Sequence, residues 1–269
     1  MNEREIAVYR TSLEATEHFT VPVNDRTTII DALEHIRLNY DPELMFRQSC
    51  HHGSCGTCGM VVNGKFVLAC TERIADQDTE KPIRVEPLPT MDQIGDLAFD
   101  PTRFMQEFPD GLTYMRDSEV NKNAETPEGI DKYTRFENCI ECGLCVSTCP
   151  VNEDWMGPAA VAAVQRQMDK EPERFEELLD LVDGARGAWN CMRDFSCVWV
   201  CPTGVKPGQK IMKVKKHLKK RVEAAAAAAG ASESSGSDSA DQGQAGSTKN
   251  AESGNANSDQ GRSRDTSTE

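Results

Sequence analysis

The sequence has no apolar run long enough to cross a membrane. A membrane-spanning helix needs about 20 mostly apolar residues, and polar or charged residues interrupt every apolar stretch of this 269-residue chain before that length. The N-terminal segment MNEREIAVYRTSLEATEHF is charged and lacks the apolar core of a secretory signal. We therefore expect a chain that remains in the cytosol and does not itself span a membrane.

Features of nucleic-acid-binding and catalytic chains are also missing. The net charge is −14, which opposes a general affinity for nucleic acid. The sequence contains no glycine-rich phosphate loop and no dinucleotide fingerprint. No group of residues has the pattern of a catalytic acid, base or nucleophile. We expect no nucleic-acid partner and no substrate chemistry on this chain alone.

Cysteine, in contrast, is abundant. The chain has eleven, an odd number that cannot pair completely into disulfides. Thiols in the cytosol stay reduced, so clustered cysteines there are more often metal ligands. They form three groups along the chain: Cys50, Cys55, Cys58 and Cys70; Cys139, Cys142, Cys145 and Cys149; Cys191, Cys197 and Cys201.

The first group lies among signals for strands. Residues 5–10 and 18–23 are predicted strands. Residues 27–39 carry apolar side chains at helical spacing, with Asp25 as the candidate helix cap. Strands around one helix predict a small β-grasp domain of the ferredoxin type, which we place at residues 1–95.

The same domain contains a predicted hairpin. Asn63 and Gly64 separate two apolar runs within residues 60–69, which is a strong hairpin signal. Residues 83–85 supply a last strand before two prolines.

The rest of the chain has a different character. Residues 100–108 and 157–183 are predicted helices, with Pro172 breaking the second. We expect an α-helical domain over residues 96–222, so the fold class is α+β. Residues 223–269 have almost no apolar side chains beyond alanine and predict a disordered tail.

The first cysteine group has the spacing of a plant-type [2Fe–2S] site. Cys50-x4-Cys55-x2-Cys58 supplies three thiolates from one loop, and Cys70 returns the fourth from the far end of the hairpin. His51 and His52 lie inside this loop. Four cysteines already complete the ligand set, so we interpret the two histidines as polar loop residues.

The second and third groups together match a two-cluster bacterial ferredoxin. In that pattern the fourth cysteine of each run binds the cluster of the other run. The predicted ligands of a [4Fe–4S] cluster are therefore Cys139, Cys142, Cys145 and Cys201. The predicted ligands of the remaining cluster are Cys149, Cys191 and Cys197.

The third group departs from the pattern at one position. Asp194 stands where the middle cysteine belongs. A cubane corner without a thiolate tends to lose its iron, which predicts a [3Fe–4S] cluster. The alternative is a four-iron cluster in which the harder carboxylate oxygen of Asp194 binds the fourth iron.

This order of motifs resembles the iron–sulfur subunits of succinate dehydrogenases and fumarate reductases. The resemblance covers about residues 5–220 and includes SCHHGSCGTCGMVVNGKFVLAC, IRVEPLP, GPAAVAAVQRQMD and CPTGVKPGQKI. It implies a β-grasp domain followed by an α-helical ferredoxin domain. It also implies a relay that passes electrons through [2Fe–2S], [4Fe–4S] and [3Fe–4S] clusters.

The resemblance further implies partners and a location. Electrons would pass between FAD in a flavoprotein subunit and a quinone at a membrane anchor, with the chain peripheral on the cytoplasmic face. Lys215 occupies the position of a lysine that lies near the quinone in the family. The tryptophan of ubiquinone-using members falls at Asp154 here, with Trp155 one step later, and the family histidine after the next ligand is Met192. These departures favour menaquinone or another low-potential quinone.

A basic run near the C-terminal end of the predicted helical domain predicts a face toward the membrane anchor or anionic lipid. The run comprises Lys206, Lys210, Lys213, Lys215, Lys216, Lys219, Lys220 and Arg221. A solvated helix face is the alternative. The alternative to the whole relay is a soluble multi-cluster ferredoxin. A thiol:fumarate or heterodisulfide-type reductase is less favoured, because paired Cys-Cys-Gly motifs are absent.

Overall fold

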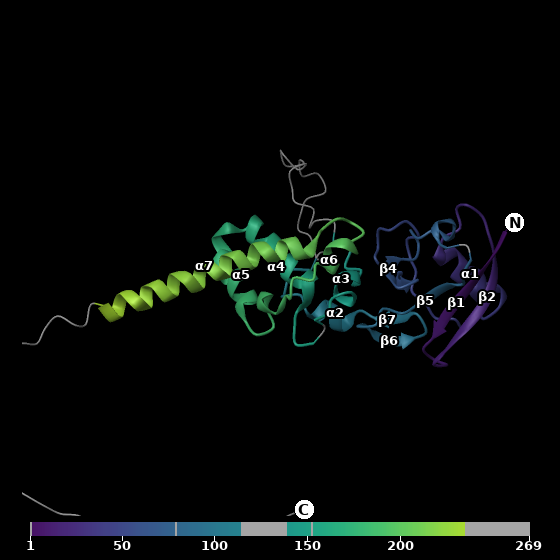
Figure 1. Ribbon diagram of the computed structural model, residues 1–269, viewed down its shortest axis with the longest axis horizontal. Helices are drawn as coiled ribbons and strands as arrows, with labels where there is room; N and C mark the ends of the chain where they lie inside the picture. Colours follow the sequence, from purple (N-terminus) through teal and green to yellow (C-terminus); the bar gives the residue numbers. More distant parts are fainter. Residues whose placement is uncertain (1, 79, 114–138, 152, 235–269) are drawn as a thin grey trace, which may run out of the picture. The chain divides into compact units, whose positions relative to one another are not determined.

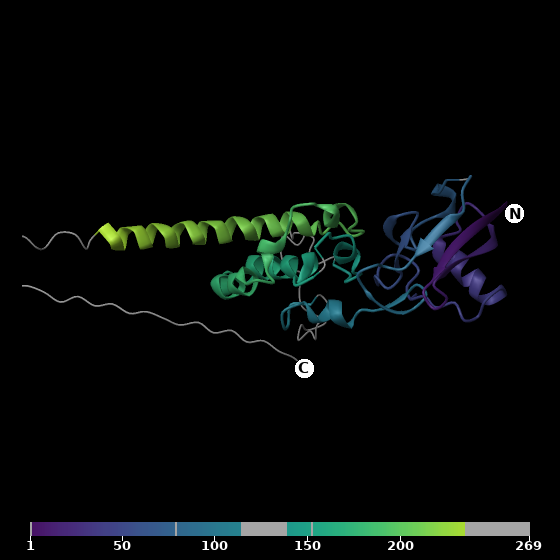
Figure 2. The same cartoon turned by 60° about the horizontal axis from the view of Figure 1, so that its bottom comes forward.

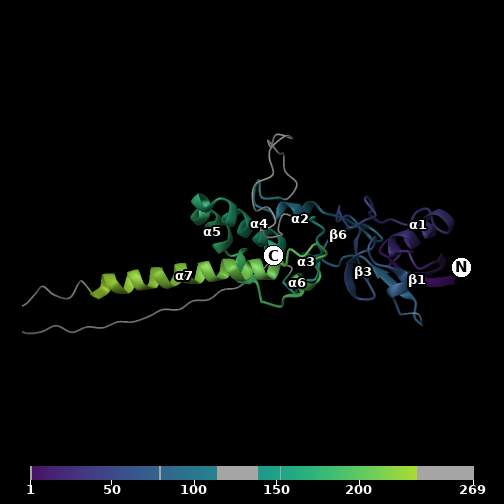
Figure 3. The ribbon, with the colours of Figure 1, turned by 90° about the horizontal axis from the view of Figure 1, so that it is seen from above.

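The computed structural model describes residues 2–78, 80–113, 139–151 and 153–234 (Figure 1). Residues through Ala225 belong to one compact unit. Its N-terminal part is a sheet with one helix, and the part after residue 101 is helical (Figures 1 and 3). The α+β class predicted from the sequence is confirmed.

A five-stranded sheet forms the N-terminal part, in the order β2-β1-β5-β3-β4. Its buried face carries Ile6, Val8 and Ile83, each fully shielded from solvent. Strands β1 and β5 are parallel and the other neighbouring pairs are antiparallel, as a β-grasp fold requires. The strands are β1 (Asn2–Arg10), β2 (Ala15–Val23), β3 (Gly59–Val62), β4 (Lys65–Leu68) and β5 (Ile83–Glu86).

Helix α1 (Ile29–Asn39) packs its buried apolar face on the sheet. The sequence suggested Asp25 as the cap of this helix, and that prediction is wrong. Thr28 is the N-cap, and it forms a capping box in which Asp31 accepts from the Thr28 amide at 2.9 Å. The box satisfies two backbone donors at once, which a more distant Asp25 could not do.

The N-terminal part contains two hairpins. The predicted turn at Asn63 and Gly64 is confirmed, and both residues have the positive φ angles (49° and 77°) of a tight hairpin turn. A second hairpin of β6 (Asp92–Gly95) and β7 (Ala98–Asp100) follows the main sheet and was not predicted. Its strands are short, and charged residues interrupt the apolar alternation that strand prediction relies on.

The helical part is built around α4 (Gly157–Lys170), whose residues are buried from Gly157 to Met168. The predicted break at Pro172 is confirmed, since a 3₁₀ turn (Pro172–Arg174) separates α4 from α5 (Phe175–Asp183). The remaining helices are α2 (Thr102–Gln106), α3 (Leu144–Ser147), α6 (Ser196–Trp199) and α7 (Pro207–Ser234). Two further 3₁₀ turns lie at Ile74–Asp76 and Ala188–Asn190.

Helices α5 and α7 lie side by side (Figure 2). The rings of Phe175 and His217 meet edge to face at 5.0 Å, and Arg221 pairs with Asp180 at 2.6 Å. Helix α7 presents Ile211, Val214 and Leu218 inward, all fully buried. Of the basic residues on α7, Lys213, Lys216, Lys219 and Lys220 are exposed, whereas Lys210 and Lys215 are buried and Arg221 faces α5.

Helix α7 continues past the boundary expected at residue 222. Alanine has the highest intrinsic helix propensity of any residue type. The alanine-rich stretch after Glu223 accordingly continues the helix, which ends at Ser234. Residues 235–269 lie outside the described part, so the disordered tail stays a prediction. Among the described residues, no helix has both the length and the apolar character needed to cross a membrane.

Candidate cluster-binding sites

The first centre comprises Cys50, Cys55, Cys58 and Cys70. Three of these cysteines lie on the loop between α1 and β3, and Cys70 follows β4. The amides of Ser54 and Cys55 donate to the Sγ atom of Cys50, each at 3.3 Å. Gly53 donates to the Sγ atom of Cys70, also at 3.3 Å. The loop thus wraps its amide hydrogens around the sulfurs.

These amides change the acidity of the first centre. Hydrogen bonds from the backbone amides of His52, Cys55 and Ser54 lower the pKa of the Cys50 thiol to about 6 against opposing burial. Burial raises the pKa of the Cys58 thiol to about 12, and Cys70 and Cys55 lie near enough to raise it further. A sulfur cradle with aimed N–H donors suits a thiolate-bound iron–sulfur cluster.

The two histidines of the loop, His51 and His52, have contacts with groups other than the cysteine sulfurs. The Nε2 atom of His51 lies 3.8 Å from Glu34, and Nδ1 of His52 contacts the carbonyl oxygen of Cys50. Within the described ranges no imidazole nitrogen has a recorded contact with a cysteine sulfur. Their interpretation as polar loop residues is consistent with this placement.

The second centre comprises Cys139, Cys142, Cys145 and Cys201. All four line one cavity, together with Leu144 and Pro202. Burial raises the pKa of Cys139 to about 11 and that of Cys142 to about 12, and it raises the pKa of Cys145 well above the usual value. The structure brings Cys201 to the cavity that Cys139, Cys142 and Cys145 line.

The third centre comprises Cys149, Cys191 and Cys197. Burial raises the pKa of Cys197 to about 12, and the nearby Cys149 and Cys191 raise it further. Cys149 in turn has Cys191 and Asp194 as electrostatic neighbours. The structure thus groups three thiols from two separate runs, with the aspartate beside them.

The Asp194 carboxylate is engaged in local hydrogen bonds. Its Oδ1 atom accepts from the backbone amide of Ser196 at 3.0 Å and also from the Ser196 hydroxyl. These bonds lower the pKa of Asp194, and the side chain is exposed. Its partner Ser196 is the first residue of α6, whose N-cap is Phe195.

Arg166 is a site residue that the sequence analysis missed. It is buried within α4, and its Nη2 atom donates to the carbonyl oxygen of Leu112 at 3.0 Å. Its guanidinium lies near enough to Cys139 to favour the thiolate of that residue. An arginine inside an alanine-rich helical segment was the available signal, because a buried cation requires a partner.

Lys215 and Trp155 occupy different surroundings. The Lys215 ammonium is buried and donates to the carbonyl oxygens of Cys191 (2.9 Å) and Trp189 (3.3 Å). Burial lowers its pKa, and the ring of Trp189 lies 5.8 Å from its Nζ atom.

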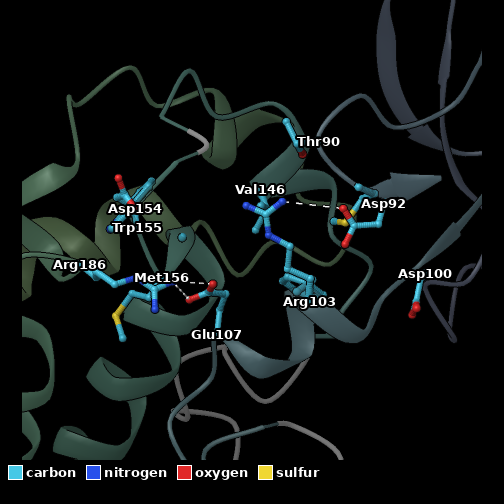
Figure 4. A pocket seen from close by; sticks show the side chains of 13 residues that line it. Thr90, Asp92, Asp100, Arg103, Glu107, Val146, Asp154, Trp155, Met156 and Arg186 are labelled. Atoms are coloured by element: carbon cyan, nitrogen blue, oxygen red, sulfur yellow. Dashed lines mark hydrogen bonds and ion pairs between the residues drawn. The ribbon is translucent and has the colours of Figure 1, made fainter. Parts of the chain in front are cut away.

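Trp155 is buried in another pocket, where Arg186 pairs with Glu107 at 2.6 Å (Figure 4). Trp189, rather than Trp155, is the tryptophan beside Lys215.

Two family models match the chain in the order of its cysteine groups. Residues 5–106 match the 2Fe-2S iron-sulfur cluster binding domain, and residues 135–205 match the 4Fe-4S dicluster domain. The chain also resembles a solved structure titled Mycobacterium smegmatis Sdh1 complex in the apo form. That match has a TM-score of 0.67 at 21% identity and covers 81% of this chain and 96% of that one, so it supports the fold.

Curated relatives match over most of their length. The fumarate reductase iron–sulfur subunit of Mycobacterium tuberculosis is 35% identical, over 78% of this chain and 90% of the relative. That of Haemophilus influenzae is 30% identical, over 77% and 89%. The mitochondrial succinate dehydrogenase [ubiquinone] iron–sulfur subunit of Candida glabrata is 31% identical, over 71% and 78%. The chain therefore belongs to the family of iron–sulfur subunits of fumarate reductases and succinate dehydrogenases.

Proposed function

We propose that this chain is the electron-relay subunit of a succinate:quinone or quinol:fumarate oxidoreductase. Its partners are a flavoprotein subunit with FAD and a membrane anchor with a quinone site. The observation that carries the proposal is the grouping of cysteines from distant runs into three separate thiol sets. The enzyme is the whole complex, and the dicarboxylate reacts on another polypeptide.

Each thiol set suits one cluster. The first centre has the four thiols of a [2Fe–2S] site, the second the four of a [4Fe–4S] site, and the third the three of a [3Fe–4S] site. When bound, these clusters accept and release single electrons. The protein would hold the second cluster in the cavity that its four cysteines line, and Cys197 of the third centre is buried.

The raised thiol pKa values also bear on assembly. At neutral pH the buried thiols of Cys139, Cys142 and Cys197 would stay protonated without metal, since their pKa values are about 11 to 12. Binding of iron must therefore displace their protons, so cluster insertion is coupled to proton release.

The position of Asp194 supports the three-iron form of the third centre. Its carboxylate already accepts two hydrogen bonds from Ser196 and is exposed. Binding a fourth iron would require giving up these bonds for a ligand type that iron–sulfur clusters use less readily than thiolate.

The surface around the third centre supports membrane association. Met192 and Trp199, which lie close to ligands of the third centre in the sequence, are 74% and 83% exposed. The exposed Lys216, Lys219 and Lys220 lie on α7 in one surface hollow with Arg193. Aromatic and basic residues together suit the headgroup region of a membrane or its anchor protein. We place the chain peripherally, on the cytoplasmic face.

Purification from membranes tests the proposal. We expect the chain to co-purify with a flavin-containing subunit, and we expect magnetic spectroscopy of the complex to detect three distinct clusters. A redox titration would then show which quinone the potentials match. A chain that is isolated alone from the soluble fraction with its clusters intact would instead support a diffusible multi-cluster ferredoxin.

Reversing the charge of the exposed α7 lysines should weaken membrane retention. For Lys216→Glu with Lys219→Glu we expect the chain and its flavoprotein partner to leave the membrane at lower salt, since each basic residue near an anionic surface contributes about 1 kcal/mol. A matched control is Lys65→Glu with Lys81→Glu, because these lysines are also exposed but belong to the sheet domain. Salt extraction of membranes measures the effect. Equal retention of the two variants would contradict a membrane-facing α7.

A further inference from the structure

The loop of the first centre packs directly on the backbone of the second. Gly56, between Cys55 and Cys58, is buried, and β4 contacts α3 across the same junction (Figure 1). A Cβ atom added at Gly56 would lie 2.5 Å from the carbonyl oxygen of Ile140 and 2.9 Å from Cβ of Cys142. Ligand loops of two different centres therefore meet at Gly56, which has no side chain.

The neighbours of Gly56 cannot swing aside. Ordinary contact with a Cβ atom begins at 3.4 Å, so the Ile140 oxygen would have to retreat by about 0.9 Å. This oxygen is part of the backbone between Cys139 and Cys142, two ligands of the second centre. Close-packed protein interiors transmit such strain rather than absorb it. The clash caused by a methyl group at Gly56 is therefore relieved most directly when the two loops move apart.

Gly59 marks the same junction from β3. Its added Cβ would lie 3.2 Å from the carbonyl oxygen of Cys142 and 3.3 Å from the side chain of Leu144. Unlike Gly56, it does not have a positive φ angle. Gly59 thus needs no left-handed conformation, and its lack of a side chain is explained by the close approach alone.

We propose that Gly56 is a positioning residue that sets the separation between the first and second clusters. This inference rests on the proposed relay function. Electron tunnelling slows steeply with distance, so the closest approach of two ligand loops controls the step between their clusters. By omitting a side chain at Gly56, the sequence lets the backbones of these loops touch.

The competing explanation is that glycine occupies position 56 only because the backbone there has a φ angle of +70°, which residues with side chains rarely adopt. Gly53 separates the two explanations. It lies in the same loop with a φ angle of +75°, but its added Cβ would meet only the Cγ2 atom of Thr71, at 3.0 Å. Thr71 follows Cys70 in the sheet domain, so Gly53→Ala carries the same backbone strain without touching the second centre.

The test measures the magnetic interaction between the two clusters in the purified complex. With both clusters reduced, their spin–spin coupling reports their separation independently of turnover. We expect Gly56→Ala to weaken this coupling and to slow the first inter-cluster electron transfer, and we expect a clearly smaller loss of coupling in Gly53→Ala, which strains the same loop without touching the second centre. The Gly59→Ala variant, free of φ strain, should weaken it less than Gly56→Ala.

Each outcome decides one question. Unchanged coupling in Gly56→Ala with both clusters present would overturn the inference, as would an equal loss in Gly53→Ala. If Gly56→Ala does not assemble, the same coupling is measured in Gly59→Ala. Unchanged coupling in that variant would overturn the inference. A wild-type complex without a [2Fe–2S] and a [4Fe–4S] cluster would refute the proposed function instead.

Discussion

Replacing Asp194 with cysteine is expected to convert the third cluster from a three-iron to a four-iron form. Position 194 lies three residues after Cys191 and three before Cys197, where the two-cluster ferredoxin pattern supplies its middle thiolate. The side chain is exposed and is an electrostatic neighbour of Cys149, so a thiol there would add a fourth candidate ligand to the three cysteines of the third centre. Thiolate is also the preferred ligand for iron in such clusters.

Spectroscopy of the oxidised complex measures this conversion. In the wild type we expect the paramagnetic signal of an oxidised three-iron cluster. In Asp194→Cys that signal should disappear, and Mössbauer spectra should show one additional iron. Because a four-iron cluster generally has a lower potential, electron delivery to the quinone should slow markedly.

The control is Asp194→Ala. It removes the hydrogen bonds from Ser196, as the cysteine variant does, but it supplies no ligand. If Asp194 does not bind iron, the three-iron signal persists in this variant. A four-iron wild-type cluster that becomes three-iron in Asp194→Ala would show instead that the carboxylate is a ligand.

The sequence was most informative where local chemistry decides the structure. Asn63 and Gly64 predict their turn because their backbone angles are needed for it, and Pro172 predicts the helix break because it has no amide hydrogen. The cysteine spacings assign a ligand set to each cluster, since iron–sulfur ligation imposes fixed patterns, and this assignment stays a prediction.

The sequence was least informative where the structure depends on contacts between distant elements. Thr28 and Asp25 are both plausible caps, and only the position of the helix start decides between them. The proximity of Arg166 to Cys139 and that of Trp189 to Lys215 arise from helix packing. The close contact at Gly56 is likewise invisible until the two loops are brought together.

Replacing Arg10 with methionine is expected to destabilise the sheet domain strongly, because Arg10 is a buried residue with several ion-pair partners. Arg10 ends β1 and is 4% exposed. Its guanidinium pairs with Asp96 at 3.0 Å, with Glu17 at 2.7 Å and with Asp41. It thereby joins the main sheet to the β6–β7 hairpin. Removing one partner of a buried ion pair costs about 3 to 5 kcal/mol, because Asp96, 1% exposed, would keep an uncompensated charge.

A surface ion pair supplies the control for this variant. Arg84 pairs with Glu86 at 2.9 Å, but its side chain is 67% exposed. Arg84→Met should therefore change stability by less than about 1 kcal/mol. Thermal unfolding of the cluster-loaded protein compares the two. Equal shifts in the unfolding temperature would mean that Arg10 does not form the central pair of the domain.

The same contact predicts a loss of stability in acid. Burial pushes the pKa of Asp96 upward, but hydrogen bonds from Arg10, Ser12 and the Met45 amide outweigh it, so the pKa lies below its usual value. A carboxyl group with a lowered folded-state pKa stabilises the fold above its unfolded pKa of about 3.9. That stabilisation is lost as the pH falls through the folded-state value. Unfolding temperatures measured from pH 6 downward should therefore fall below about pH 4, and the contribution of Asp96 to that fall should be smaller in Arg10→Met, where the pKa is less depressed.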